Sequence, residues 1–310
     1  MYRKMLVMLD GSELAEVVFP FATELAARLD LEVILLQVYG PLGRDFVPVH
    51  RAYVERAAEE IQRQIGELQE KIGIPKEQRQ ARARGELAGG HYADEILSFA
   101  EQNAIDLIMM ASHGRSGIRR WRMGSVADKV MRASKVPVWF VRAGVADAVS
   151  YEEWPSRTIL VPLDGSERAE AVLPHVETLA RQRSIEPIHV TLLRVCDPPM
   201  APSYYSPELS GVPLNWGEFM EQEVTRCRHA ATEYLAGVGK RLADTGAKIE
   251  LEVLVGKAAD EIINYASKHP YSVVVMTTHG RSGLSRLVYG SVAESILTAV
   301  TNPILLAKPA

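Results

Sequence analysis

The chain has 310 residues, of which 47% are hydrophobic and 24% are charged, and its formal net charge is −4. This composition is that of an ordinary globular protein of about two domains, and neither half is basic enough to predict a nucleic-acid surface from bulk charge. No apolar stretch reaches the roughly 20 residues that a membrane-spanning helix needs, and the N-terminus lacks the apolar run of a secretion signal. We therefore expect a cytoplasmic protein that binds neither nucleic acid nor membrane.

The first apolar run, Lys4 to Asp10, predicts a buried strand that ends in a carboxylate, and Thr158 to Glu167 repeats it. A helical pattern follows each run, with Ser12 or Ser166 as the expected N-cap. Pro20 and Pro174 lie inside these two helical patterns and predict a kink at the same place in each.

The next runs, EVILLQVYG and PIHVTLLRVCD, are apolar almost throughout, which is typical of strands covered on both faces in a parallel sheet. Long helices are predicted at about 49–71 and 219–242. Between Pro198 and Pro213, five prolines exclude a regular helix and favour a long loop or lid. A passive surface loop is the alternative.

Each half then continues with a strand (QARARG, KIELEVLVG), a helix around the aligned DEI triplets, and a final strand (VPVWFVRA, NPILLAKP). Alternating strands and helices predict βαβ units with right-handed crossovers. We expect two tandem α/β domains, residues 1–145 and 156–310, each a doubly wound parallel sheet of five strands. The final strands should pair with each other, because pairing would cover two exposed sheet edges.

Cys196 and Cys227 are the only cysteines of the chain. They form no CxxC motif and have no histidine at a zinc-ligand spacing, so neither a disulfide framework nor a zinc site is indicated. A single pair could still form, but we expect two buried thiols that pack as small apolar side chains.

The strongest pattern occurs twice, as MASHGRSGIRRWRMGSVADKVM at 110–131 and MTTHGRSGLSRLVYGSVAESIL at 276–297. Both copies contain His-Gly, nine further residues and Gly-Ser, and they align at a constant difference of 166, as in 279 − 113. This constant spacing indicates a duplicated unit. Each copy runs from a buried strand through a glycine-rich loop to a helix N-terminus, an order in which many folds hold phosphate.

In a doubly wound sheet, ligands bind outside the carboxyl ends of the strands. The aspartate after the first strand (Asp10, Asp164) and the His-Gly loop after the fourth should therefore meet. The Gly-Ser pair opens the last helix, where backbone N–H groups favour an anion. A serine in this position is by itself more often an N-cap, but the joint spacing in both copies favours a phosphate site.

Both halves resemble the universal stress protein domain, and the whole chain resembles a tandem member of that family. Its nucleotide-binding members carry GxxGx9G followed by Ser or Thr after the fourth strand, and an Asp at the end of the first. Here the motifs run from Ala111 to Ser125 and from Thr277 to Ser291, so the first glycine is replaced by Ala111 and Thr277. Met8 stands where the family usually has Pro.

The resemblance implies that the chain binds ATP or another adenine nucleotide, with Mg²⁺ if the triphosphate is bound, and that it regulates a stress response. It also implies that the two domains pair within the chain as single-domain members pair into dimers, and that the chain itself could form a homodimer. The residues implied at the nucleotide are Asp10, Val38, Ala111, Ser112, His113, Gly114, Gly124, Ser125 and Val126 in the first domain, and Pro162, Asp164, Val195, Thr277, Thr278, His279, Gly280, Gly290, Ser291 and Val292 in the second.

The sequence contains no GxxxxGK[ST], GxSxG or HExxH motif, so we name no catalytic residue and expect a binding protein rather than an enzyme. Two alternatives stay open. One is a slow ATPase that depends on His279 and Asp164. The other is a protein with degenerate pockets that works through partner binding or chaperoning.

Overall fold

The computed structural model describes residues 2–112, 123–142, 158–197, 216–270, 272–280 and 289–309. The described strands of the N-terminal half are β1 (Lys4–Leu9), β2 (Glu32–Tyr39), β3 (Arg82–Gly89), β4 (Leu107–Ala111) and β5 (Val138–Val141). Those of the C-terminal half are β6 (Thr158–Pro162), β7 (His189–Cys196), β8 (Lys248–Val255), β9 (Val273–Thr277) and β10 (Ile304–Ala307).

These strands form one ten-stranded sheet in the order β3-β2-β1-β4-β5-β10-β9-β6-β7-β8. Among the described strands, pairing is parallel within each half and antiparallel only between β5 and β10, where Trp139 lies opposite Leu305. The predicted doubly wound α/β fold is confirmed, and so is the pairing of the two final strands. The two five-stranded sheets are therefore continuous across the middle of the molecule.

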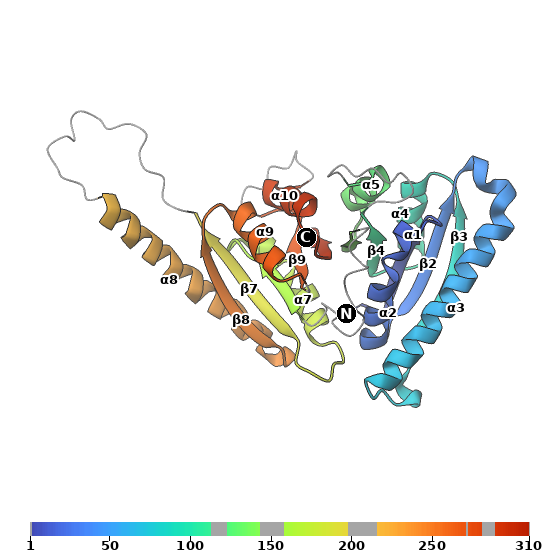
Figure 1. Cartoon of the computed structure of the whole chain (residues 1–310), viewed down its shortest axis with the longest axis horizontal. Coiled ribbons are helices and arrows are strands. Elements are labelled where there is room, and N and C mark those ends of the chain that lie inside the picture. The colour runs from blue at the N-terminus through green and yellow to red at the C-terminus, as the bar shows by residue number, and fades with distance from the viewer. Residues whose placement is uncertain are drawn as a thin grey trace.

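Helices cover both faces of the sheet (Figure 1). The helices are α1 (Glu13–Glu16), α2 (Phe19–Leu29), α3 (Val47–Lys71), α4 (Tyr92–Gln102), α5 (Ser125–Ala133), α6 (Glu167–Glu170), α7 (Leu173–Ala180), α8 (Trp216–Leu242), α9 (Ala258–Lys268) and α10 (Ser291–Ala299). One core cluster packs α2, α3, α7 and α8 against one face, and a second packs α4, α5, α9 and α10 against the other. Burial on both faces explains why the central strands are apolar almost throughout.

The helical pattern after each first strand is divided into two helices, where the sequence suggested one kinked helix. Pro20 and Pro174 each occupy the first turn of the second helix, α2 or α7, because a proline lacks the N–H that a helix interior requires. Ser12 and Ser166 are confirmed as N-caps, since their side chains accept hydrogen bonds from the N–H groups of Ala15 and Ala169.

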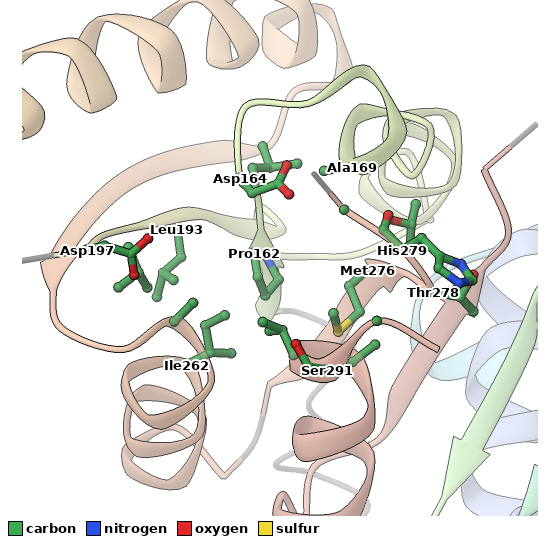
Figure 2. A pocket seen from close by; sticks show the side chains of 18 residues that line it. Pro162, Asp164, Ala169, Leu193, Asp197, Ile262, Met276, Thr278, His279 and Ser291 are labelled. Atoms are coloured by element: carbon green, nitrogen blue, oxygen red, sulfur yellow. The ribbon is translucent and has the colours of Figure 1, made fainter. Parts of the chain in front are cut away.

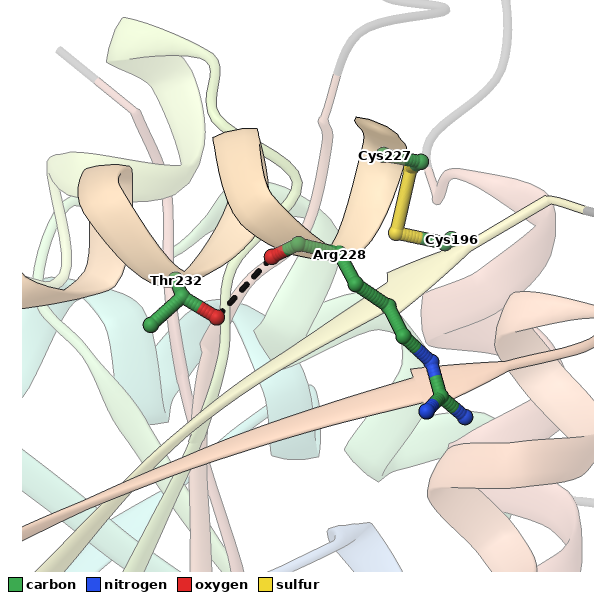
Figure 3. The surroundings of a disulfide bond; sticks show 4 residues. All are labelled: Cys196, Cys227, Arg228 and Thr232. Carbon is green, nitrogen blue, oxygen red and sulfur yellow. Dashed lines mark hydrogen bonds between the residues drawn. A yellow bond between two sulfur atoms is a disulfide. The ribbon is translucent and has the colours of Figure 1, made fainter. Parts of the chain in front are cut away.

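The expectation of two free thiols is wrong, because Cys196 and Cys227 form a disulfide (Figure 3). Helix α8 packs on β7 and β8 and brings the two Cα atoms to 6.1 Å, which is within the range that a disulfide spans. The cysteines are 31 residues apart in sequence. Their pairing therefore depends on how the helix packs and not on a local motif.

Polar contacts also join the two halves away from β5 and β10. Arg28 of α2 forms a buried ion pair with Glu24 on the same helix, at 4% and 1% exposure. The Arg28 guanidinium also donates to the carbonyl oxygen of Arg183 in the other half, at 2.9 Å. Nearby, the Tyr2 hydroxyl lies 2.9 Å from Nδ1 of His175.

The loop or lid predicted at 198–213 lies outside the described residues, as does most of the connection between the halves. No helix in the described part of the chain combines the length and the apolar character that crossing a bilayer requires.

Candidate functional site

A cavity of about 230 Å³ opens at the carboxyl ends of the C-terminal strands. Strand β6 and the turn after it contribute Pro162 and Asp164, and the segment after β9 contributes Thr278, His279 and Gly280. The N-terminus of α10 forms a third wall with Gly290 and Ser291 (Figure 2). The cavity therefore brings together the elements that the repeated motif predicts.

The Asp164 carboxylate is held by the turn that follows β6. Its Oδ1 atom accepts hydrogen bonds from the Ser166 N–H at 2.9 Å and from the Ser166 hydroxyl at 2.6 Å. Its Oδ2 atom faces Gly280, where an added β-carbon would clash with that oxygen. Gly280 thus lets the loop approach the carboxylate, and Asp10 is held in the same way by Ser12.

The loop after β9 is held by the two threonines that precede His279. The Thr277 hydroxyl donates to the carbonyl oxygen of His279 at 2.8 Å, and Oγ1 of Thr278 lies 3.0 Å from Nδ1 of the same histidine. Both threonines are buried. The residue at the family's first glycine position therefore fixes the course of the loop through its own side chain.

Helix α10 begins without a side-chain cap at the cavity wall. Its N-cap is Gly290, and Ser291 is the first residue of the helix, with no side-chain capping hydrogen bond. The interpretation of Ser291 and Ser125 as ordinary N-caps is therefore wrong, because the glycine before each serine takes that place. The Gly290 N–H donates to the carbonyl oxygen of Thr278 at 2.8 Å, which positions the first turn beside the loop.

An N-terminus of this kind attracts negative charge, because the first N–H groups of a helix have no intrahelical partner and the helix dipole is positive there. The other end of the cavity is mainly apolar and is formed by Leu193, Val195 and Ile262. Asp197 lies at that end in Figure 2, away from His279. The arrangement suits an elongated ligand that has an anionic group at one end and an apolar ring at the other.

The N-terminal half contains a matching cavity of about 290 Å³. Of the predicted residues, it is lined by Asp10, Val38, Ala111, Ser112, Gly124, Ser125 and Val126. His113 and Gly114 lie outside the described residues. Here too the glycine before the last helix is bonded to the end of the preceding strand segment, since the Gly124 N–H donates to the carbonyl oxygen of Ser112 at 3.0 Å.

All ten predicted residues of the C-terminal half line its cavity, and the structure adds others that the sequence analysis missed. The added pairs are Ile96 and Ile262, Met110 and Met276, and Tyr92 and Ala258. The apolar members belong to strand and helix patterns that predict only core packing, so nothing in the sequence separates them from other buried residues. Tyr92 distinguishes the two cavities among the described residues, because Ala258 stands in its place.

Within the described ranges, no group of three or more His, Cys, Asp or Glu side chains is placed to hold a metal ion. Two carboxylates line the C-terminal cavity, Asp164 next to the loop at Gly280 and Asp197 at the apolar end.

A model of the universal stress protein family matches residues 1–142 and 155–308. Universal stress protein MJ0577 of Methanocaldococcus jannaschii is 29% identical over 156 residues, which are 49% of this chain and 94% of that protein. Universal stress protein YxiE of Bacillus subtilis is 29% identical over 154 residues, 46% of this chain and 100% of that protein. Each of these relatives thus corresponds to about half of the chain.

Among solved structures, a universal stress protein from Archaeoglobus fulgidus matches 99% of this chain and 98% of its own, with a TM-score of 0.61 and 18% identity. At this identity the likeness concerns the fold. Two successive family matches, together with the duplicated sheet and the duplicated cavity, account for nearly the whole chain. The chain belongs to the universal stress protein family, as a tandem of two family units.

Proposed function

We propose that this tandem protein binds an adenine nucleotide, with ATP as the first candidate, and acts as a regulator in a stress response. The observation that carries the proposal is the uncapped N-terminus of α10, which lies in one cavity with the Asp164 carboxylate and an apolar end. The phosphates would lie at Gly290 and Ser291, and the base would lie between Val195 and Ile262.

We propose the same role for the cavity of the N-terminal half. The units 1–145 and 156–310 would then each bind one nucleotide. The N-terminus of α5 is built in the same way, with Gly124 as an N-cap that has no side chain. Mg²⁺ would enter with the triphosphate, since this ion usually keeps several waters and takes its other ligands from phosphates and one or two carboxylates. In the C-terminal cavity Asp164 would supply that carboxylate.

A carboxylate at Gly290 tests the proposal. A β-carbon on Gly290 would lie 3.5 Å from the carbonyl oxygen of Thr278, an ordinary contact, and Asp is a favoured N-cap, so Gly290→Asp should fold. It should weaken ATP binding in the C-terminal cavity by at least about tenfold, because two like charges about 5 Å apart repel by ~3 kcal/mol at an effective dielectric constant of about 20.

The measurement is calorimetric titration of the full chain with ATP, preceded by mass analysis of any nucleotide released from the denatured protein. Gly124→Asp is the matched variant for the other cavity, since its β-carbon would also lie 3.5 Å from a carbonyl oxygen. Gly290→Ala, which adds the β-carbon without the charge, is the control. If the chain with both aspartates binds ATP as tightly as the unchanged chain, the phosphates do not lie at these helices and the proposal is wrong.

A further inference from the structure

The disulfide lies directly beside the C-terminal cavity. Cys196 is the last residue of β7, and its neighbours Val195 and Asp197 both line the cavity. Because successive side chains of a strand point to opposite faces, Cys196 faces α8 while Val195 faces the cavity. The bond to Cys227 therefore ties the strand end that forms the apolar wall to the long helix behind it (Figure 3).

The same strand end also supports the opposite side of this wall. The Gly256 N–H donates to the carbonyl oxygen of Cys196 at 3.0 Å, and Ala258, two residues further on, lines the cavity. A change in the position of Cys196 would therefore act on Val195 directly and on the start of α9 through Gly256.

The N-terminal half has no covalent bond at the corresponding place. Tyr39 ends β2 as Cys196 ends β7, and its carbonyl oxygen accepts from the Gly90 N–H at 3.0 Å in the same way. Its ring stacks on His50 of α3, with the centroids 6.3 Å apart. One half thus ties its strand end to the long helix through a ring contact, and the other through a bond that thiols can break.

The two sulfur atoms differ in how far a reagent can reach them. Cys196 is 2% exposed, whereas Cys227 is only partly buried on α8. Cys227 is therefore the more accessible residue of the pair, so an attacking thiolate would reach its Sγ first and Cys196 would be the sulfur that leaves. In reducing compartments, disulfides are usually transient and often sense the redox state.

We propose that Cys196 and Cys227 form a reversible redox switch that sets the nucleotide affinity of the C-terminal cavity; the affinity part of this proposal rests on the proposed function. On oxidation by a hydroperoxide, the Cys227 thiolate takes one oxygen atom to become a sulfenic acid, and an alcohol or water leaves. The Cys196 thiol then displaces water from that sulfur and closes the disulfide, so two thiols have lost two electrons and two protons.

On reduction, a dithiol attacks Sγ of Cys227, forms a mixed disulfide and releases the Cys196 thiolate. The second thiol of the reductant then displaces Cys227 and leaves as a cyclic disulfide. Without the bond, the wall around Val195 loses its covalent tie to α8 and is held there by packing alone. We expect nucleotide affinity in the C-terminal cavity to fall roughly tenfold, a size common for coupled sites.

The test uses full-length protein that carries Gly124→Asp, so that only the C-terminal cavity reports. ATP affinity is measured by calorimetry after treatment with hydrogen peroxide and again in dithiothreitol, with free thiols counted in each state. Oxidised protein should bind about tenfold more tightly than reduced protein. Cys227→Ser in the same background should bind like the reduced protein in both conditions, and protein with Gly290→Asp, which reports the other cavity, should not respond.

A second measurement needs no nucleotide. Hydrogen exchange at the Gly256 amide should become faster on reduction, while the matching Gly90 amide, which pairs with Tyr39, should not change. Equal ATP affinity in the two redox states would overturn the switch, and equal Gly256 exchange would show that the disulfide does not control the wall. If ATP binds in neither state, the proposed nucleotide binding by the C-terminal cavity fails, and the Gly256 exchange alone then decides whether the disulfide controls the wall.

Discussion

The contribution of the disulfide to stability can be worked out from the length of chain that it closes. The bond joins residues 31 positions apart, and for a loop of this length the chain-entropy relation gives a stabilisation of about 3.7 kcal/mol at 25 °C. Cys227→Ser releases this constraint on the unfolded chain, and the change of side chain itself should create little cavity, because serine is similar in size and Cys227 is only partly buried.

The expected shift in melting temperature depends on how much of the chain unfolds together. With an unfolding entropy of about 2.1 cal/mol/K per residue, 3.7 kcal/mol lowers the melting temperature by about 6 °C if all 310 residues unfold as one unit. If the C-terminal half of about 155 residues unfolds alone, the shift is about 11 °C. The size of the shift therefore also reports whether the continuous sheet makes the two halves cooperative.

The assay is thermal unfolding of the full chain followed by far-ultraviolet circular dichroism, under non-reducing conditions and in dithiothreitol. Reductant should lower the melting temperature of the unchanged protein to that of Cys227→Ser and should leave the variant where it is. The reasoning is refuted if oxidised protein, reduced protein and variant melt at the same temperature.

Three further changes test the packing between helices, sheet and halves. Gly85→Ala should cost about 1–3 kcal/mol of unfolding free energy, because a β-carbon there would lie 2.6 Å from the backbone of α3. The control is Gly66→Ala, which lies inside α3 with open space around it and should stabilise the chain by up to about 1 kcal/mol. Equal urea midpoints for the two variants would contradict this. Glu24→Gln leaves the guanidinium of Arg28 buried without its charged partner and should lower the unfolding free energy by about 3 kcal/mol. Replacing both residues, by Leu and Met, should recover most of the loss. A Glu24→Gln variant as stable as the unchanged protein would rule out a structural role for the pair. Burial lowers the pKa of the His175 imidazole, so the native state takes up its proton less readily than the unfolded chain. The contribution of this residue to stability should be fully present above about pH 6.5 and should be lost as the pH falls through the lowered pKa. An unfolding profile whose acid limb is as steep in His175→Gln as in the unchanged chain would show that this residue is not responsible.

Much of the fold was predictable because its determinants are local. Strands buried on both faces must be apolar throughout, so runs such as EVILLQVYG indicate a parallel sheet without any knowledge of their neighbours. The constant spacing of the repeated motif likewise predicts two copies of one unit. Ser12 and Ser166 were predictable as N-caps because a cap bonds to a backbone group only three residues away.

Other features of the site could not be predicted, because they depend on contacts between distant residues. Ser291 follows the N-cap instead of occupying it, and this depends on a hydrogen bond from Gly290 to Thr278 across the loop. Met276 and Ile262 line the cavity, but in the sequence they belong to ordinary apolar patterns of a strand and a helix.

The sequence by itself therefore determined the duplicated α/β unit and the residues of the repeated motif, because apolar periodicity and spacing are properties of neighbouring residues. The pairing of the final strands was predictable for another reason, since each of them is an apolar edge that needs covering. Only the tertiary structure decided that Cys196 and Cys227 are joined, and that this bond lies behind the wall of the C-terminal cavity. A disulfide requires two Cα atoms at the right distance, and that distance is set by how α8 packs across the sheet.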